Sequence, residues 1–147
     1  MTNSLESRVQ RLEDIEEIRD LLIAYGRALD SRDLDAYSQL FARDGEWRGG
    51  LGSARTPAEI KAMLEKAFAG MTPGLYRTPH HVMSNFDIVL DGDTATAHSR
   101  WEWVAGDSGN APTILRAGRY EDELVREDGR WRFQKRRAVT ELQAEQE

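Results

Sequence analysis

The chain has 147 residues, a length typical of one domain with a substantial core, and we interpret residues 1–147 as a single domain. It contains no cysteine, which excludes disulfides, thiolate metal sites and a cysteine nucleophile. The formal net charge of −6 argues against a nucleic-acid-binding surface, and no apolar run approaches the length of a membrane span. The polar N-terminus is unlike a signal peptide, so we expect a cytoplasmic protein with no nucleic-acid or membrane partner.

The first predicted element is a long amphipathic helix, whose apolar residues recur at steps of three and four. They are Leu5, Val9, Leu12, Ile15, Ile18, Leu22, Tyr25 and Leu29. Asp33 can cap a short second helix. The apolar residues of this second helix are Leu34, Tyr37, Leu40 and Phe41.

A short strand or turn is expected around Trp47, where glycines gather. The next helix has the clearest start signal in the chain. Thr56 is its cap, Pro57 suits its first position, and Glu59 completes a capping box. Gly70 is a plausible stop for this helix.

From about residue 77 the apolar period changes from helical to two, which is typical of strands. The predicted strands cover residues 81–90, 94–104, 113–126 and 131–140, with tight turns at 91–92 and 128–129. Helices followed by an antiparallel meander indicate an α+β fold, in which the amphipathic helices cover one face of the sheet. The basic run at 135–137 is interpreted as a solvated or interface stretch.

Successive side chains on a strand point to opposite faces of the sheet. One face of the strand at 94–104 is expected to face inward, around a conical hollow with small residues at one end and large aromatics at the other. This face carries Ala95, Ala97, Ser99, Trp101 and Trp103. On the preceding strand His81, Met83 and Asn85 share one face, and apolar residues at 82, 86, 88 and 90 share the other. Apolar residues on both sides favour a homodimer, or a higher homo-oligomer, through the outer sheet face.

The most informative residues are Tyr25 and Asp30 at the end of the first helix and His81 on the first long strand. An acid, a histidine and a phenol can take a proton from carbon and give one to a leaving group. Each has an alternative interpretation. The His81–Asp30 pair can be a structural hydrogen bond, Asp30 can be a helix cap, and Tyr25 can be core packing. An ideal helix also projects Tyr25 and Asp30 about 140° apart.

The other candidates are expected to line the hollow and contact a substrate, although core packing, or a structural hydrogen bond for Asn85, explains each of them as well. They are Trp47, Met63, Met83, Asn85, Trp101, Trp103 and Tyr120. The adjacent His80 and His81 do not predict a metal site, because neighbours on a strand point apart and no carboxylate completes a ligand set. We therefore expect neither a metal nor another cofactor.

Several motifs occur in order along the chain. They are Y-x4-D at 25–30, FARDGEW at 41–47, H-x3-N at 81–85, DGDTATA at 91–97, GRYEDEL at 118–124 and DGRW at 128–131. With these motifs the chain resembles the SnoaL-like branch of the nuclear transport factor 2-like superfamily. The resemblance implies a cone-shaped, curved antiparallel sheet packed on N-terminal helices, a cystatin-like roll with a pocket inside.

The same resemblance carries an expectation about chemistry. Scytalone dehydratase and bile acid 7α-dehydratase, two enzymes of this superfamily, use a His–Asp pair that matches His81 and Asp30, and the bile acid enzyme has a tyrosine that matches Tyr25. We expect a cofactor-independent lyase or isomerase that is similar to these dehydratases and acts on a hydrophobic small molecule. The alternatives are a non-catalytic protein that binds a hydrophobic ligand and a polyketide-cyclase-like enzyme.

Overall fold

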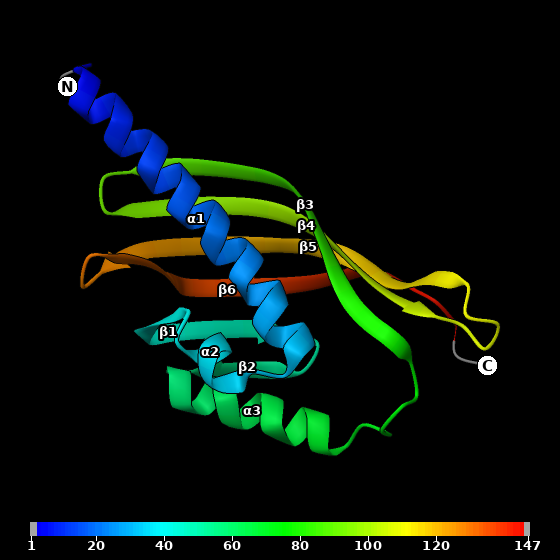
Figure 1. The fold of residues 1–147 in the computed structure, drawn as a ribbon. Coiled ribbons are helices and arrows are strands. Elements are labelled where there is room, and N and C mark those ends of the chain that lie inside the picture. Colours follow the sequence, from blue (N-terminus) through cyan, green and yellow to red (C-terminus); the bar gives the residue numbers. More distant parts are fainter. Residues whose placement is uncertain (1–2, 146–147) are drawn as a thin grey trace.

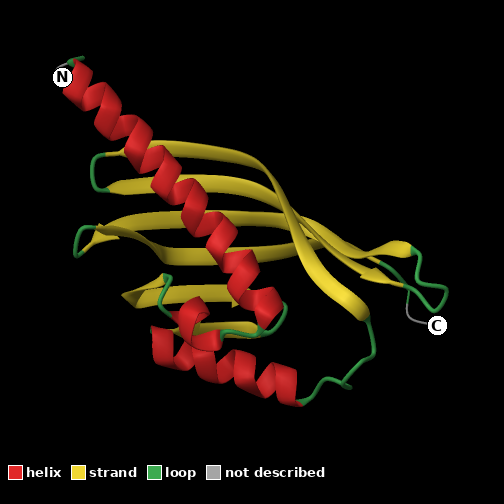
Figure 2. Ribbon diagram, viewed as in Figure 1, coloured by secondary structure: helices red, strands yellow, loops and turns green. Residues whose placement is uncertain are grey.

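The computed structural model describes residues 3–145, which form three helices and six strands (Figures 1 and 2). In chain order the elements are α1 (Leu5–Ser31), α2 (Leu34–Ser38), β1 (Phe41–Gly49), β2 (Gly52–Arg55), α3 (Pro57–Ala69), β3 (Arg77–Asp91), β4 (Thr94–Gly106), β5 (Pro112–Glu127) and β6 (Arg130–Gln143). The helices lie on one side of a curved sheet, and α1 crosses that side diagonally (Figure 1). The predicted α+β cone is confirmed.

The sheet has the strand order β2-β1-β6-β5-β4-β3. All adjacent strands are antiparallel except β1 and β6, which run parallel. The sheet is therefore mixed, whereas a purely antiparallel sheet was expected from the sequence. A parallel pair needs a long connection between its strands. Here β2, α3 and the β3–β5 meander provide that connection, so the last strand, β6, returns to lie beside β1.

Helix α1 buries only part of its predicted apolar stripe. Ile18, Leu22 and Tyr25 belong to the core, whereas Leu5, Val9 and Leu12 are 72%, 44% and 66% exposed. The reason is visible in Figure 1, where the N-terminal part of α1 extends past the edge of the sheet. The assignment of these three residues to the core face was therefore wrong.

The predicted second helix is shorter than expected. It ends at Ser38, and Phe41 opens β1, where its ring lies 5.2 Å from that of Phe133 on β6. Leu40 and Phe41 still pack in or against the core, but as part of the strand region. Apolar spacing alone does not distinguish these two outcomes for so short a segment.

The predicted start of α3 is confirmed with one change. The Thr56 hydroxyl accepts a hydrogen bond from the Glu59 backbone N–H at 3.3 Å. The Glu59 carboxylate accepts from the Arg55 N–H at 3.2 Å rather than from Thr56, whose own N–H is bonded to the Gly45 carbonyl. The capping box thus ties α3 to the end of β2.

Strand β3 contains a β-bulge that the sequence did not predict. Asn85 has a positive φ of 56°, and the register with β4 shifts between Ser84 and Asp87. Because the bulge inserts one residue, Met83 before it and Phe86 after it both pack against the core. The interpretation of Phe86, Ile88 and Leu90 as a second, outer apolar face was wrong, and so was the inward placement of Asn85, which is exposed.

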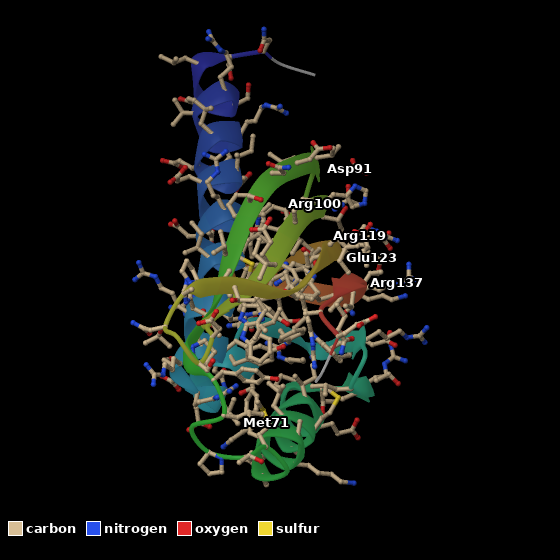
Figure 3. The ribbon with its side chains drawn as sticks, turned by 90° about the vertical axis from the view of Figure 1, so that its right-hand side faces the viewer. Met71, Asp91, Arg100, Arg119, Glu123 and Arg137 are labelled. Atoms are coloured by element: carbon tan, nitrogen blue, oxygen red, sulfur yellow. The ribbon has the colours of Figure 1, made fainter. Side chains whose placement is uncertain are left out.

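The outer face of the sheet is charged rather than apolar. A chain of ion pairs runs across it through Arg100, Glu141, Arg119, Glu121 and Arg137. Figure 3 shows Arg100, Arg119 and Arg137 on the side of the sheet away from α1. Of the apolar residues that motivated the homodimer, Phe86, Ile88 and Leu90 turn inward, whereas Val82 stays 40% exposed. The homodimer itself stays a prediction. No helix within residues 3–145 is long and apolar enough to cross a membrane.

Candidate functional site

The helices and the inner sheet face enclose an open cavity of about 750 Å³. Seven of the predicted site residues line it: Tyr25, Asp30, Trp47, His81, Trp101, Trp103 and Tyr120. The other three do not belong to its wall. Met63 and Met83 pack against the core, and Asn85 is exposed at the bulge of β3. The structure thus brings Tyr25, Asp30 and His81 to one cavity. Three other candidates, which were chosen only for the face of the helix or strand on which they lie, do not line it.

His81 and Asp30 form the most directional contact on the cavity wall. The Asp30 carboxylate accepts from the His81 backbone N–H at 2.9 Å and lies 2.6 Å from the ring Nδ1. A carboxylate only accepts hydrogen bonds, so Nδ1 carries the proton and Nε2 is left as a proton acceptor. Nε2 has no hydrogen-bond partner among residues 3–145, and the His81 side chain is 16% exposed. The imidazole is held in one tautomer at the edge of the cavity.

Local geometry explains why two residues 51 positions apart meet. Gly26 lets β3 approach α1 closely, because a side-chain Cβ at this position would lie 2.9 Å from the Met83 methyl group. One helical turn beyond Gly26 is Asp30, and two strand residues before Met83 is His81. Four residues of a helix rise about 6 Å and two residues of a strand about 6.8 Å. The close approach at Gly26 and Met83 therefore also places Asp30 opposite His81.

Tyr25 and Asp30 reach the same cavity even though they diverge around the helix. Helix α1 ends at Ser31, followed by Arg32 in the left-handed region with a φ of 62°, and the cavity is broad enough to contact both side chains. The Tyr25 oxygen accepts hydrogen bonds from the Tyr37 hydroxyl at 2.8 Å and from the Trp47 indole N–H at 3.0 Å. Tyr25 therefore belongs to a buried polar cluster and does more than fill the core.

A buried ion pair beneath this cluster was missed. Arg136 donates two hydrogen bonds to Asp122, at 2.9 and 3.1 Å, and its guanidinium lies 3.6 Å from the centre of the Tyr120 ring and 4.1 Å from that of Tyr25. Arg136 is fully buried, so the interpretation of residues 135–137 as a solvated or interface stretch was wrong for this residue. The sequence feature that could have indicated this pair is Asp122, which lies on the same strand face as Tyr120. A carboxylate is buried in a core only when it has a partner.

The hydroxyl groups around Tyr25 are donors at neutral pH. Burial raises the pKa of Tyr37 and of Tyr120 well above the ordinary value for tyrosine. Arg136 opposes the rise for both residues. The floor of the cavity therefore presents neutral phenols backed by a fixed positive charge.

The apolar wall is formed by Trp101 and Trp103 on β4. The Trp101 ring packs over Gly118, where a Cβ would lie 2.9 Å from the ring and 1.9 Å from the Val139 carbonyl oxygen. Its indole N–H donates to the Arg119 carbonyl at 3.2 Å, which fixes the ring against the wall. Trp103 makes an edge contact with Tyr76, with ring centres 4.9 Å apart. Both indoles line the cavity and give it an apolar wall.

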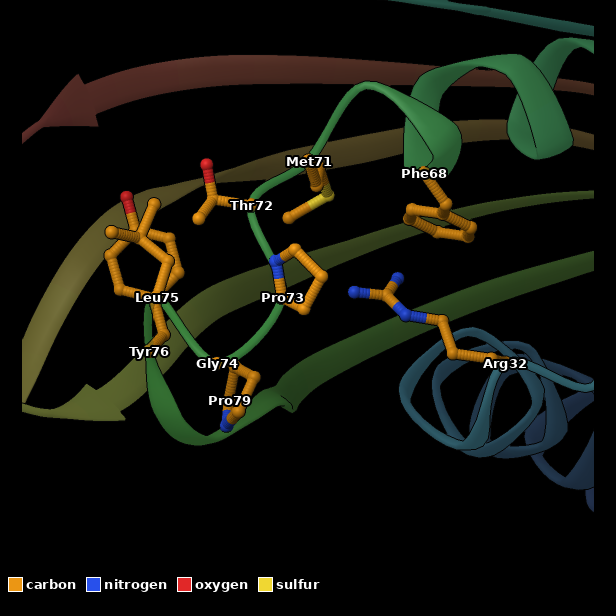
Figure 4. Close-up of a pocket in the computed structure, with 9 residues that line it drawn as sticks. All are labelled: Arg32, Phe68, Met71, Thr72, Pro73, Gly74, Leu75, Tyr76 and Pro79. Carbon is orange, nitrogen blue, oxygen red and sulfur yellow. The ribbon is translucent and has the colours of Figure 1, made fainter.

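At the mouth of the cavity, Arg32, Phe68 and the loop at 71–79 border a smaller hollow of about 270 Å³ (Figure 4). Several of these residues line the large cavity as well, so the two hollows share part of their wall. Within residues 3–145, no three His, Asp or Glu side chains gather in a way that would hold a metal ion.

A family model of the SnoaL-like domain matches residues 10–137. The chain belongs to the SnoaL-like domain family. The match includes Tyr25, Asp30 and His81, the three residues whose chemistry was singled out. An uncharacterized protein of Mycobacterium tuberculosis, Rv2910c, is similar to this SnoaL-like protein, with 30% identity over 133 residues, 87% of this chain and 86% of the relative.

Solved structures agree with the fold. An NTF2-like protein with a cystatin-like fold from Novosphingobium aromaticivorans superposes with a TM-score of 0.81 and 29% identity, over 95% of this SnoaL-like chain and 92% of its own. A candidate scytalone dehydratase from the same organism gives a TM-score of 0.75 at 23% identity, over 93% and 90% of the two chains. The second likeness shows the fold alone.

Proposed function

We propose that this SnoaL-like protein is a cofactor-independent lyase or isomerase of the dehydratase type, in which His81 and Asp30 transfer a proton on a hydrophobic small molecule. The observation that carries the proposal is the 2.6 Å contact between His81 Nδ1 and Asp30 on the wall of an open cavity. It leaves Nε2 as an oriented base beside an apolar surface. The fold likeness to a candidate scytalone dehydratase supports the reaction class by analogy only.

In the proposed reaction His81 Nε2 takes a proton from a carbon next to a carbonyl group. The electron pair of that C–H bond becomes a new C=C bond, and the C–O bond to a β-hydroxyl group breaks. The hydroxyl leaves as water after receiving a proton from the Tyr25 phenol. The imidazolium then loses its proton to solvent and the Tyr25 phenolate takes one up from solvent, which restores both groups. An isomerase would use the same first step and return the proton to a different carbon.

Tyr25 is the proposed donor to the leaving hydroxyl or to the developing oxyanion. Two donors, Tyr37 and Trp47, already bond to its oxygen and fix the orientation of the phenol. Donors on a phenol oxygen make its own O–H a stronger donor, because hydrogen bonds in a chain polarise one another. The guanidinium of Arg136 near the ring supports the same role.

The test uses β-hydroxy ketones of one to three rings, beginning with 3-hydroxy-1-tetralone, which forms fluorescent 1-naphthol when it loses water. The protein should accelerate elimination for at least one of these compounds. His81→Ala should lower kcat by about 100-fold or more, the usual contribution of a positioned general base. Circular dichroism and urea unfolding establish that the variant is folded.

His80→Ala is the matched control, since His80 is the exposed neighbour on the same strand and does not line the cavity. It should leave turnover unchanged. Tyr25→Phe should lower kcat more than it changes KM if Tyr25 donates in the transition state. Elimination that persists in His81→Ala, or absent turnover across all the compounds, would reject the proposal in favour of a protein that only binds its ligand.

A further inference from the structure

Two arginines line the cavity without an anionic partner. Arg32 follows the end of α1 and Arg116 lies near the start of β5. Within residues 3–145 neither guanidinium makes an ion pair or a hydrogen bond, whereas that of Arg119, three residues along β5, pairs with Glu121 and Glu141. Asp30 is the one carboxylate among the described residues of the cavity wall, and it is committed to His81. The mouth therefore carries unneutralised positive charge in a chain whose net charge is −6.

Aromatic rings hold both guanidinium groups in place. The Arg32 guanidinium lies 3.6 Å from the centre of the Phe68 ring, and that of Arg116 lies 5.5 Å from the centre of the Trp103 ring. Figure 4 shows Arg32 extending from the helix end toward Pro73, with Phe68 beside it. Contact with a ring uses the face of a guanidinium and leaves its in-plane N–H groups available. Those groups match the geometry of a carboxylate.

Burial supports the need for a counter-charge at the mouth. It lowers the pKa of the Arg32 guanidinium, and the charge of Asp30 opposes this. The guanidinium nevertheless stays protonated at neutral pH, since arginine does not lose its proton in proteins. A partly desolvated cation without a partner gains free energy when an anion binds.

The register of the sheet sets the spacing between this charge and the base. His81, Trp103, Arg116 and Gln143 are paired neighbours on four adjacent strands. Strands lie about 4.8 Å apart, so the Cα atoms of His81 and Arg116 are separated by roughly 10 Å. Trp103 lies between them. A ligand with a flat apolar body on Trp103 could place one end at His81 and an anionic group at Arg116.

We propose that the ligand of this cavity is an amphipathic organic anion, an apolar ring system with one carboxylate or similar acidic group that Arg116 and Arg32 bind at the mouth. The inference rests on the proposed function, because it names the substrate class of the same site. It adds a requirement that the chemistry at His81 does not impose. Proton transfer at a carbon beside a carbonyl works equally on neutral molecules, whereas the two arginines at this mouth favour an anion over its neutral analogue.

The experiment compares matched acids and amides of increasing size: benzoate and benzamide, 2-naphthoate and 2-naphthamide, anthracene-2-carboxylate and its amide. Binding is measured by calorimetry and by ligand-observed NMR, which reaches millimolar affinities. At least one acid should bind about tenfold tighter than its amide, as expected for one charge-assisted hydrogen bond. The preference should shrink at high salt, because the mouth is open to solvent.

The variants assign the preference to the arginines. Arg116→Gln should reduce it, and Arg32→Gln with Arg116→Gln should abolish it while the amides bind as before. Arg119→Gln is the control on the outer face of the same strand and should keep the preference. Acids that bind no better than amides, no binding by any acid at millimolar concentration, or a preference that survives in the double variant would overturn the proposal.

This outcome is separable from that of the proposed function. The binding test needs no turnover, and His81→Ala should retain the preference for acids. A protein that selects acids but turns over no hydroxy ketone, including acidic ones, keeps this inference and loses the catalytic proposal. A protein that turns over neutral hydroxy ketones and shows no preference for acids keeps the catalytic proposal and loses this inference.

Discussion

Arg136 is a charged side chain with no exposed surface, and its contacts explain how the core accepts it. Asp122 accepts two of its hydrogen bonds, and the Tyr120 ring covers its guanidinium at 3.6 Å. Burial raises the pKa of the Asp122 carboxyl, and Arg136 works in the opposite direction. Each partner therefore depends on the other to remain charged in the core.

The first prediction concerns this pair. Arg136→Met leaves the Asp122 carboxylate buried without a partner and should lower the free energy of unfolding by about 3–5 kcal/mol. Adding Asp122→Leu should recover most of that loss, since two apolar side chains can replace a buried pair at little cost. Urea unfolding measures both. Arg137→Met, at the exposed next position, should cost less than about 1 kcal/mol. A double variant as unstable as the single one would contradict this account.

At this scale the sequence could single out His81 and Asp30, because few residue types perform proton transfer and both match a His–Asp pair of the family that the chain resembles. It could not identify Arg136 or Tyr37. Arg136 lies within a basic run, and its burial depends on Asp122 of the neighbouring strand. Tyr37 lies on a helix of five residues, too short for a periodic signal to reveal that its hydroxyl reaches Tyr25.

At the scale of elements, one carboxylate on α1 bonds to residues on β5 and β6 at the turn between these strands. Asp14 accepts hydrogen bonds from Arg126 at 2.7 Å, from the Trp131 indole at 3.1 Å and from Gln10 at 3.1 Å. Burial alone would raise the pKa of Asp14, but these bonds outweigh burial and hold the pKa below its ordinary value of 3.8. The contact is therefore worth most when the carboxylate is ionised.

The second prediction follows from the sign of that shift. A carboxyl with a lowered pKa in the folded state contributes stability above its ordinary value, and this is lost as the pH falls through the folded value. Asp14→Asn should cost about 1–3 kcal/mol of unfolding free energy at pH 7. The difference from the parent protein should shrink as the pH falls below 3.8. Urea unfolding at several pH values measures this. Asp20→Asn, exposed on the same helix, should show neither effect, and a pH-independent cost for Asp14→Asn would rule the explanation out.

The elements also show which sequence signals were sufficient. Thr56, Pro57 and Glu59 predicted the start of α3, and the pair at 128–129, both with positive φ, forms the expected hairpin turn. The bulge at Asn85 was not predictable from alternation, because one inserted residue reverses the face of every residue after it. The parallel pairing of β1 with β6 joins segments that lie far apart in the chain, which local patterns do not encode.

At the scale of the whole molecule, the curved sheet separates two different surfaces. The concave side holds the helices, the core and the cavity. The convex side carries charged residues such as Arg119 and Arg137 (Figure 3), and both of these pair with Glu121. The cone itself was predictable from the order of the elements and from the family motifs. Which residues lie on the outer face was not predictable, since the bulge in β3 reverses the faces of the residues that follow it.

The third prediction concerns self-association through that outer face. We expect a homodimer held there to rely largely on ionic contacts, because a chain of ion-paired side chains crosses this face and Phe86, Ile88 and Leu90 turn inward. Raising the salt from 0.1 to 0.5 M shortens the screening length from about 10 Å to about 4 Å, so the dimer should weaken. Arg137→Glu should weaken it further, whereas Lys66→Glu, a matched reversal on α3, should not. Sedimentation equilibrium measures the dissociation constant in each case. A monomer at both salt concentrations, or a dimer that neither salt nor Arg137→Glu affects, would show that this face does not mediate association.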